Sequence, residues 1–171
     1  MKLRIIPALV AVAFLAGCSG DGDQNSGAGS ESIEVSTSST PSFVAQVVSP
    51  INAPDDGDPV VDPGLNVEYR FQGTGYGTNG GSVIYLAVKN LNEVPLPADA
   101  IGQPTLKIKD YNGSMTDIES LPGDDNIPLD LPLGVGATTN LQWAFNTSTG
   151  SLWSAEFRVG NVIFRGNLNN M

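Results

Sequence analysis

The sequence predicts an all-β fold, an antiparallel β-sandwich of about seven or eight strands that follows a disordered tether. Three observations support this prediction. Hydrophobic residues make up 40% of the 171 residues, which indicates a packed core. The 20 glycines and 12 prolines separate short apolar stretches, as turns separate strands. No helical period of useful length occurs, so we expect no crossover helices and therefore antiparallel pairing.

The N-terminal residues have the pattern of a secretion signal. Lys2 and Arg4 precede an apolar segment, residues 5–15, that is too short to cross about 30 Å of hydrocarbon. The sequence Leu-Ala-Gly-Cys that ends at Cys18 resembles the lipobox of bacterial lipoproteins. This resemblance implies that residues 1–17 are a lipoprotein signal peptide and that the Cys18 thiol carries the lipid. The alternative is an ordinary secretion signal with an incidental cysteine.

Residues 18–41 are mostly Ser, Gly, Thr, Asp, Glu, Asn and Gln, with Ile33 and Val35 as the sizeable apolar side chains. Such a composition cannot form a core and predicts a flexible tether. A random coil of this length spans roughly 25–30 Å. We therefore expect one β-sandwich domain, residues 42–169, held at the extracytoplasmic face of the cell membrane or of an outer membrane.

Charge and composition exclude several classes of function. Removal of Lys2 and Arg4 with the signal leaves six basic and eighteen acidic residues, a formal charge of −12. Such a surface repels nucleic acid and anionic lipid headgroups. The chain has no histidine, so it lacks the usual general base, the commonest metal ligand and every histidine-dependent catalytic triad. Cys18 is the only cysteine, so no disulfide can form within the chain.

The first half of the domain contains three predicted strands. Residues 43–48 are a short apolar run that predicts a first strand at a sheet edge, followed by a long loop rich in proline and aspartate. Residues 65–72 alternate apolar and polar side chains, which is typical of a half-buried strand. Residues 82–90 are apolar on both faces, as expected of a central strand.

The second half contains the remaining strands. Residues 105–109 alternate around Leu106 and Ile108, and Asn112 with Gly113 predicts a tight hairpin turn into a partner strand, residues 114–118. A long loop, residues 119–137, follows. Inward-facing apolar positions then predict three further strands. The first contains Leu141, Trp143 and Phe145, and the second contains Trp153, Ala155, Phe157 and Val159. The third, residues 162–164, follows a turn at Gly160 and Asn161.

Three short motifs carry a family resemblance. They are Val88-Lys89-Asn90 at a strand end, Asp110-Tyr111-Asn112-Gly113 at a hairpin, and Leu133-Gly134 leading to Leu141, Trp143 and Phe145. The stretch from about residue 60 to residue 164 resembles the immunoglobulin-like immunoprotective extracellular proteins of actinobacteria and related uncharacterised bacterial lipoprotein domains. The resemblance implies an immunoglobulin-like sandwich on an exported protein, and it supplies no catalytic residue.

Two features of residues 75–80, the spacing of the glycines and a tyrosine among them, suggest binding sites. Gly75, Gly77 and Gly80 have the spacing G-x-G-x-x-G of a dinucleotide site, but they lead into a strand where that site needs a helix, so a glycine-rich loop is the preferred interpretation. Tyr76, which lies among these glycines, is either a partner contact or a cover for the end of the sandwich.

Acidic and tryptophan residues suggest further alternatives. Asp55, Asp56, Asp58 and Asp62 supply oxygen ligands for Ca²⁺ without the EF-hand spacing, so a solvated acidic loop is preferred. Trp143 and Trp153 form either a sugar-stacking face or, on core-facing strand positions, part of the core. The eighteen acidic residues leave open a hydrolase with two carboxylates across a cleft.

Strand parity predicts a polar distribution of charge. Because each antiparallel strand reverses direction, alternate loops gather at the same end of a sandwich. The uncharged loops, residues 73–81, 112–113 and 146–151, then share one end, which the tether enters. The other end, facing away from the membrane, collects Asp55, Asp56, Asp58, Asp62, Glu93, Asp99, Glu119, Asp124, Asp125 and Asp130.

From these features we expect a lipid-anchored, non-enzymatic, immunoglobulin-like module that makes contacts at the cell envelope and uses no cofactor. The expected partners are the membrane, through the lipid on Cys18, and an envelope protein or a cationic partner at the acidic end. The alternatives are a module that binds Ca²⁺ or wall polysaccharide, and a secreted hydrolase.

Overall fold

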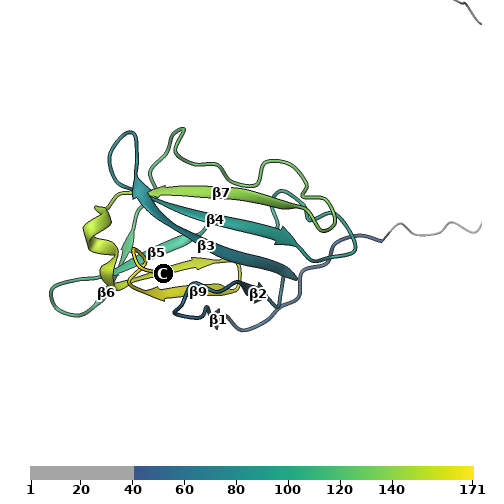
Figure 1. The fold of residues 1–171 in the computed structure, drawn as a ribbon, viewed down its shortest axis with the longest axis horizontal. Coiled ribbons are helices and arrows are strands. Elements are labelled where there is room, and N and C mark those ends of the chain that lie inside the picture. The colour runs from purple at the N-terminus through teal and green to yellow at the C-terminus, as the bar shows by residue number, and fades with distance from the viewer. Residues whose placement is uncertain (1–40) are drawn as a thin grey trace, which may run out of the picture. The chain divides into compact units, whose positions relative to one another are not determined.

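The computed structural model describes residues 41–171, so Cys18, the predicted signal peptide and residues 18–40 of the predicted tether lie outside the described residues. The described chain is mostly β and forms two sheets in a sandwich-like arrangement (Figure 1), which confirms the predicted class. Its elements are β1 (Ile51–Asn52), β2 (Val60–Asp62), β3 (Val67–Tyr76), β4 (Ser82–Asn90), β5 (Thr105–Lys109), β6 (Met115–Ile118), β7 (Thr138–Phe145), the 3₁₀ helix η1 (Thr149–Ser154), β8 (Ala155–Val159) and β9 (Val162–Gly166). Within residues 41–171, no helix is long and apolar enough to span a membrane.

One sheet has the strand order β1-β9-β8-β5-β6, and the other has the order β2-β3-β4-β7. Neighbouring strands are antiparallel except for β1, which pairs with β9 in parallel. β3 and β4 form the longest ladder, and its register pairs the inward-facing side chains of Phe71 and Leu86. β4 and β5 coincide with the predicted strands, residues 82–90 and 105–109.

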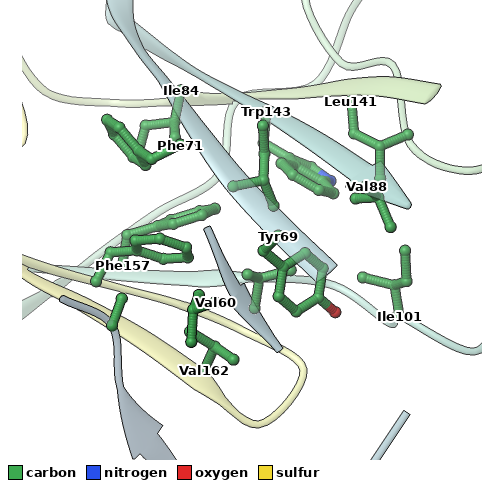
Figure 2. Packing of buried hydrophobic residues seen from close by; sticks show 14 of the residues in the cluster. Val60, Tyr69, Phe71, Ile84, Val88, Ile101, Leu141, Trp143, Phe157 and Val162 are labelled. Carbon is green, nitrogen blue, oxygen red and sulfur yellow. The ribbon is translucent and has the colours of Figure 1, made fainter. Parts of the chain in front are cut away.

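The core lies between the two sheets and is rich in aromatic rings (Figure 2). Phe71 of β3 packs on Phe164 of β9 with ring centroids 5.4 Å apart. Phe145 of β7 meets Phe157 of β8 edge-on, with centroids 6.1 Å apart. Trp143 is 1% exposed and packs on Phe157 with centroids 6.0 Å apart. Aromatic pairs of this geometry contribute about 0.5–1.5 kcal/mol each beyond the area they bury.

β3 continues past its predicted end at residue 72 because it contains a bulge. The register shifts between Phe71 and Gly73, and Gly73 has φ +109°, a value that favours glycine. Beyond the bulge, Gly75 leaves room for the ring of Tyr85 on the outer face, where a Cβ atom would lie 3.0 Å from the ring. Beyond the bulge, β3 continues to Tyr76, its last residue, at the end of the sandwich.

The predicted first strand is wrong. Residues 43–48 form no strand, and Val44 and Val47 are 69% and 104% exposed. A short apolar run predicts a strand only if a neighbouring strand offers it a ladder, and this segment makes one backbone hydrogen bond to the sandwich, from the Gln46 N–H to the Gly64 carbonyl, at 2.8 Å. The strands β1 and β2 lie instead within the predicted proline-rich loop.

Candidate functional site

Three large aromatic side chains are exposed at one end of the sandwich. Tyr76 is the last residue of β3, Tyr111 lies in the β5–β6 turn and Trp153 lies in η1; they are 83%, 108% and 60% exposed. Figure 1 shows these three segments at the left, opposite the place where the described chain enters the sandwich. We call the surface formed by Tyr76, Tyr111 and Trp153 the aromatic end. Tyrosine and tryptophan are the side chains that most often dominate binding surfaces.

The β5–β6 turn holds Tyr111 out in solvent. The Gly113 N–H donates to the Asp110 carbonyl at 3.1 Å, and Gly113 has φ +87°. This is a three-residue turn closed by a glycine in the left-handed region. Asp110 Oδ1 accepts hydrogen bonds from the N–H groups of Asn112 and Ser114, both at 2.8 Å. Because the backbone is fixed in this way, the side chain of Tyr111 projects from the outside of the turn.

η1 closes the same end of the sandwich and divides its two large side chains between core and solvent. Successive residues of a 3₁₀ helix project about 120° apart. Leu152 is therefore fully buried while Trp153 is exposed. The Leu168 N–H donates to the Leu152 carbonyl at 3.0 Å and fixes this arrangement.

The prediction that Trp153 faces the core at the start of a strand is therefore wrong. β8 begins only at Ala155. The alternation of Ala155, Phe157 and Val159 extends back to Trp153 in the sequence by coincidence, because the backbone at Trp153 is helical and its side chain does not follow the alternation of a strand. The core prediction for Trp143 is confirmed, since its side chain is 1% exposed.

A groove of about 850 Å³, open to solvent, runs between the β5–β6 turn and η1. The turn residues Asp110, Tyr111, Asn112 and Gly113 contribute to its lining. Gly150, Ser151 and Trp153 contribute from η1, and Ile108, Lys109 and Thr116 complete the lining. Its volume lies in the range of ligand sites, and its mixture of aromatic rings with a few polar groups is typical of them.

Side-chain hydrogen bonds brace this end. The Thr74 hydroxyl donates to Asn169 Oδ1 at 2.7 Å, and Asn169 Nδ2 donates to the Thr149 carbonyl at 2.9 Å. These two bonds connect β3, the C-terminal segment and the start of η1. The segments that carry Tyr76 and Trp153 are therefore connected to each other by hydrogen bonds.

The predicted separation of acidic and uncharged loops is wrong. The N–H and the hydroxyl of Thr78, in the β3–β4 turn, donate to the Asp125 carboxylate at 2.7 and 2.8 Å, so Asp125 lies at the end predicted to be uncharged. Parity fails because residues 119–137 do not stay at one end but extend along the edge of β7. Two isolated antiparallel bridges attach them to β7, Ser120 to Phe145 and Ile127 to Gln142, and a third joins Leu133 to Leu96, in the segment between β4 and β5.

The chain enters at the end opposite the aromatic end. Gln46 is hydrogen-bonded to Gly64, and a Cβ atom on Gly64 would meet the side chains of Val48 and Asn161. We call this region, formed by Gln46, Asp62, Gly64 and Asn161, the entry end. The prediction placed Asp62 far from the point of entry, so this part of the predicted orientation is also wrong.

Asp62 is the centre of the entry end and is fully buried. Its Oδ1 accepts hydrogen bonds from the N–H groups of Gly64 and Leu65 and from Asn161 Nδ2, and its Oδ2 accepts the Asn161 N–H. The carboxylate thus ties the β2–β3 turn to the β8–β9 turn. Burial raises the pKa of the nearby Tyr69 hydroxyl above its ordinary value, and the charge of Asp62 raises the pKa further.

The other predicted candidates do not converge on a site. Gly75 lies in β3, while Gly77 and Gly80 form the turn into β4, as the glycine-loop interpretation expects. Asp55 and Asp56 lie between β1 and β2 and are exposed. Within residues 41–171, no group of three His, Cys, Asp or Glu side chains is arranged to hold a metal ion.

Tyr111 is the functional candidate that the sequence analysis missed. It entered only as part of a family motif, although its sequence context contains a usable signal. In Asp-Tyr-Asn-Gly the aspartate caps the turn and the glycine takes the left-handed conformation, so the second residue must project outward. Comparisons of the chain with family models, with curated proteins and with solved structures found no match.

Proposed function

We propose that this protein is a lipid-anchored, extracytoplasmic, immunoglobulin-like module that makes non-enzymatic contacts at the cell envelope through its aromatic end. The observation that carries the proposal is the exposure of Tyr76, Tyr111 and Trp153 at the end opposite the point where the chain enters. Exposed aromatic side chains on a braced backbone bind without a large entropic cost, because their rings have few rotatable bonds.

The strand order supports the immunoglobulin-like assignment. In immunoglobulin domains strands G, F, C and C′ form one sheet, and A, B, E and D form the other. In this protein β9, β8, β5 and β6 correspond to G, F, C and C′, and β3, β4 and β7 correspond to A, B and E, both in their order within the sheets and in their order along the chain. Residues 119–137, which bridge to the free edge of β7, occupy the place of strand D.

The direction of entry supports presentation away from an anchor. If Cys18 carries a lipid, residues 18–41 lead from the membrane to the entry end. β3 runs from the entry end to the aromatic end, and its ten residues span about 33 Å. The aromatic end then lies at the far side of the domain from its attachment, where envelope components can reach it.

Neither a hydrolase nor a Ca²⁺-binding module gains support from the described residues. A glycoside hydrolase needs two carboxylates across a cleft. Asp62 is the buried carboxylate of the described chain, and four N–H donors already engage it. A Ca²⁺ module needs several converging oxygen ligands, and the exposed Asp55 and Asp56 lie in a loop without such convergence.

Site-specific photo-crosslinking in intact cells tests the proposal. A photoreactive phenylalanine analogue replaces Tyr111 or Trp153 at the aromatic end, and Lys89, exposed on the outer face of the other sheet, serves as the matched control. We expect crosslinked envelope material at Tyr111 and Trp153 and little at Lys89. Equal crosslinking at Lys89, or none at the aromatic end, would contradict the proposal.

A further inference from the structure

We propose that the groove between the β5–β6 turn and η1 binds a neutral polysaccharide, with pyranose rings stacked on Trp153 and Tyr111. This inference rests on the proposed function and gives the chemical class of the material that the aromatic end contacts. The argument has three parts, which are the two rings, the polar groups between them and the charge of the surroundings.

The two rings in the groove have the chemistry that sugars require. A pyranose with equatorial hydroxyls has axial C–H groups on its faces, and these faces are apolar. Trp153, from η1, and Tyr111, from the β5–β6 turn, both line the groove and are both largely exposed. When such a sugar face stacks on an exposed aromatic ring, both apolar surfaces are removed from water, which favours binding.

The remaining groove residues suit hydroxyl groups. A sugar hydroxyl both donates and accepts, so it needs acceptors and donors together. Asp110 uses Oδ1 for the turn, while its Oδ2 accepts no hydrogen bond from the described residues. The side chains of Asn112, Thr116 and Ser151 add amide and hydroxyl groups at the edges of the same groove.

The charges of the groove and of the whole chain favour a neutral polymer over an anionic one. The groove holds one base, Lys109, and one acid, Asp110, so it has no net charge of its own. The formal charge of the whole chain is −10, which repels polyanions at a distance. The groove is also open to solvent, so a long polymer can enter from the side, which an enclosed cavity would prevent.

Calorimetric titration of the full mature protein in a non-glycosidic detergent tests this inference. The probes are three neutral hexasaccharides, cellohexaose, chitohexaose and laminarihexaose, and the anionic hexagalacturonate. We expect at least one neutral probe to bind with stoichiometry near one and hexagalacturonate to bind at least tenfold more weakly. Absence of binding by all three neutral probes, or tighter binding of hexagalacturonate, would overturn the inference.

Variants assign the binding to the groove. Trp153→Ala and Tyr111→Ala should each weaken binding at least tenfold, whereas Trp153→Phe, which keeps a ring, should retain most of it. Tyr76→Ala is the matched control, because Tyr76 is exposed at the same end but does not line the groove. An equal loss in Tyr76→Ala would overturn the groove as the site.

The outcome also separates this inference from the proposed function. If no neutral probe binds while crosslinking at Tyr111 in cells persists, the sugar inference fails and the proposed function stands. If crosslinking at the aromatic end is absent as well, both fail.

Discussion

Trp143 and Trp153 differ in the free energy of unfolding that their substitution costs. Trp143 is 1% exposed within the core, so Trp143→Ala should lower stability by about 3–5 kcal/mol. Trp153 is 60% exposed, so Trp153→Ala should change stability by no more than about 0.5 kcal/mol. Chemical denaturation of the two variants checks both values. Similar losses in the two variants would contradict the assignment of one to the core and the other to the surface.

Tyr69 should make stability depend on alkaline pH. Its pKa is raised by burial first and by Asp62 second, so the unfolded chain releases the hydroxyl proton at lower pH than the folded chain does. The contribution of Tyr69 to the free energy of unfolding is therefore fully present below about pH 10. As the pH rises above this value, the free energy of unfolding falls by up to about 1.4 kcal/mol per pH unit.

Tyr69→Phe is the variant that checks this pH dependence. The Tyr69 hydroxyl has no hydrogen-bond partner within the described residues, so phenylalanine keeps the packing without losing a bond. Unfolding free energies measured near neutral pH and above pH 10 should show a smaller alkaline loss in the variant than in the wild type. The same alkaline loss in both proteins would show that Tyr69 is not responsible.

At the scale of elements, the β5–β6 turn depends on one glycine. Gly113 has φ +87°, so Gly113→Ala forces a side chain into the left-handed region and should cost about 1–2 kcal/mol. Gly134→Ala is the matched control, since Gly134 has an ordinary φ and a Cβ atom there meets only Ala137, at 3.9 Å. Thermal unfolding should separate the two variants, and equal melting temperatures would contradict the turn geometry.

Strands could be predicted where the sequence alternates and where partners are close along the chain. β3 and the β5–β6 hairpin follow from apolar alternation and from the Asn112-Gly113 turn, and β4 follows from a run of residues that is apolar on both faces. β1 could not be predicted, because its two residues pair in parallel with Val162 and Ile163, more than a hundred residues away. No local pattern encodes such a contact.

The candidate site was less predictable than the strands. Alternation assigned Trp153 to the core because it extends the pattern of Ala155, Phe157 and Val159, and the 3₁₀ geometry that turns Trp153 outward is set by the burial of Leu152. Loop parity failed for Asp125 because residues 119–137 follow the edge of β7. Both failures reflect tertiary contacts that override local sequence patterns.

For the molecule as a whole, we expect the lipid predicted on Cys18 to determine where the domain acts. Cys18→Ser should abolish lipid attachment, because the transfer requires the sulfur nucleophile. Fatty-acid labelling and detergent partitioning check this, and the variant should move to the aqueous fraction. A variant that still takes up label or partitions into detergent would contradict the lipobox interpretation.

Sedimentation of Cys18→Ser protein with isolated envelopes of cells that lack the protein tests the central claim, since the variant cannot bind through lipid. One comparison protein carries alanine at Tyr76, Tyr111 and Trp153. The other carries asparagine at Asp55, Asp56, Asp124 and Asp125. We expect the alanine variant to lose most of its envelope binding and the asparagine variant to retain it. Retained binding in the alanine variant, with loss in the asparagine variant, would contradict the account and assign the contacts to the acidic loops.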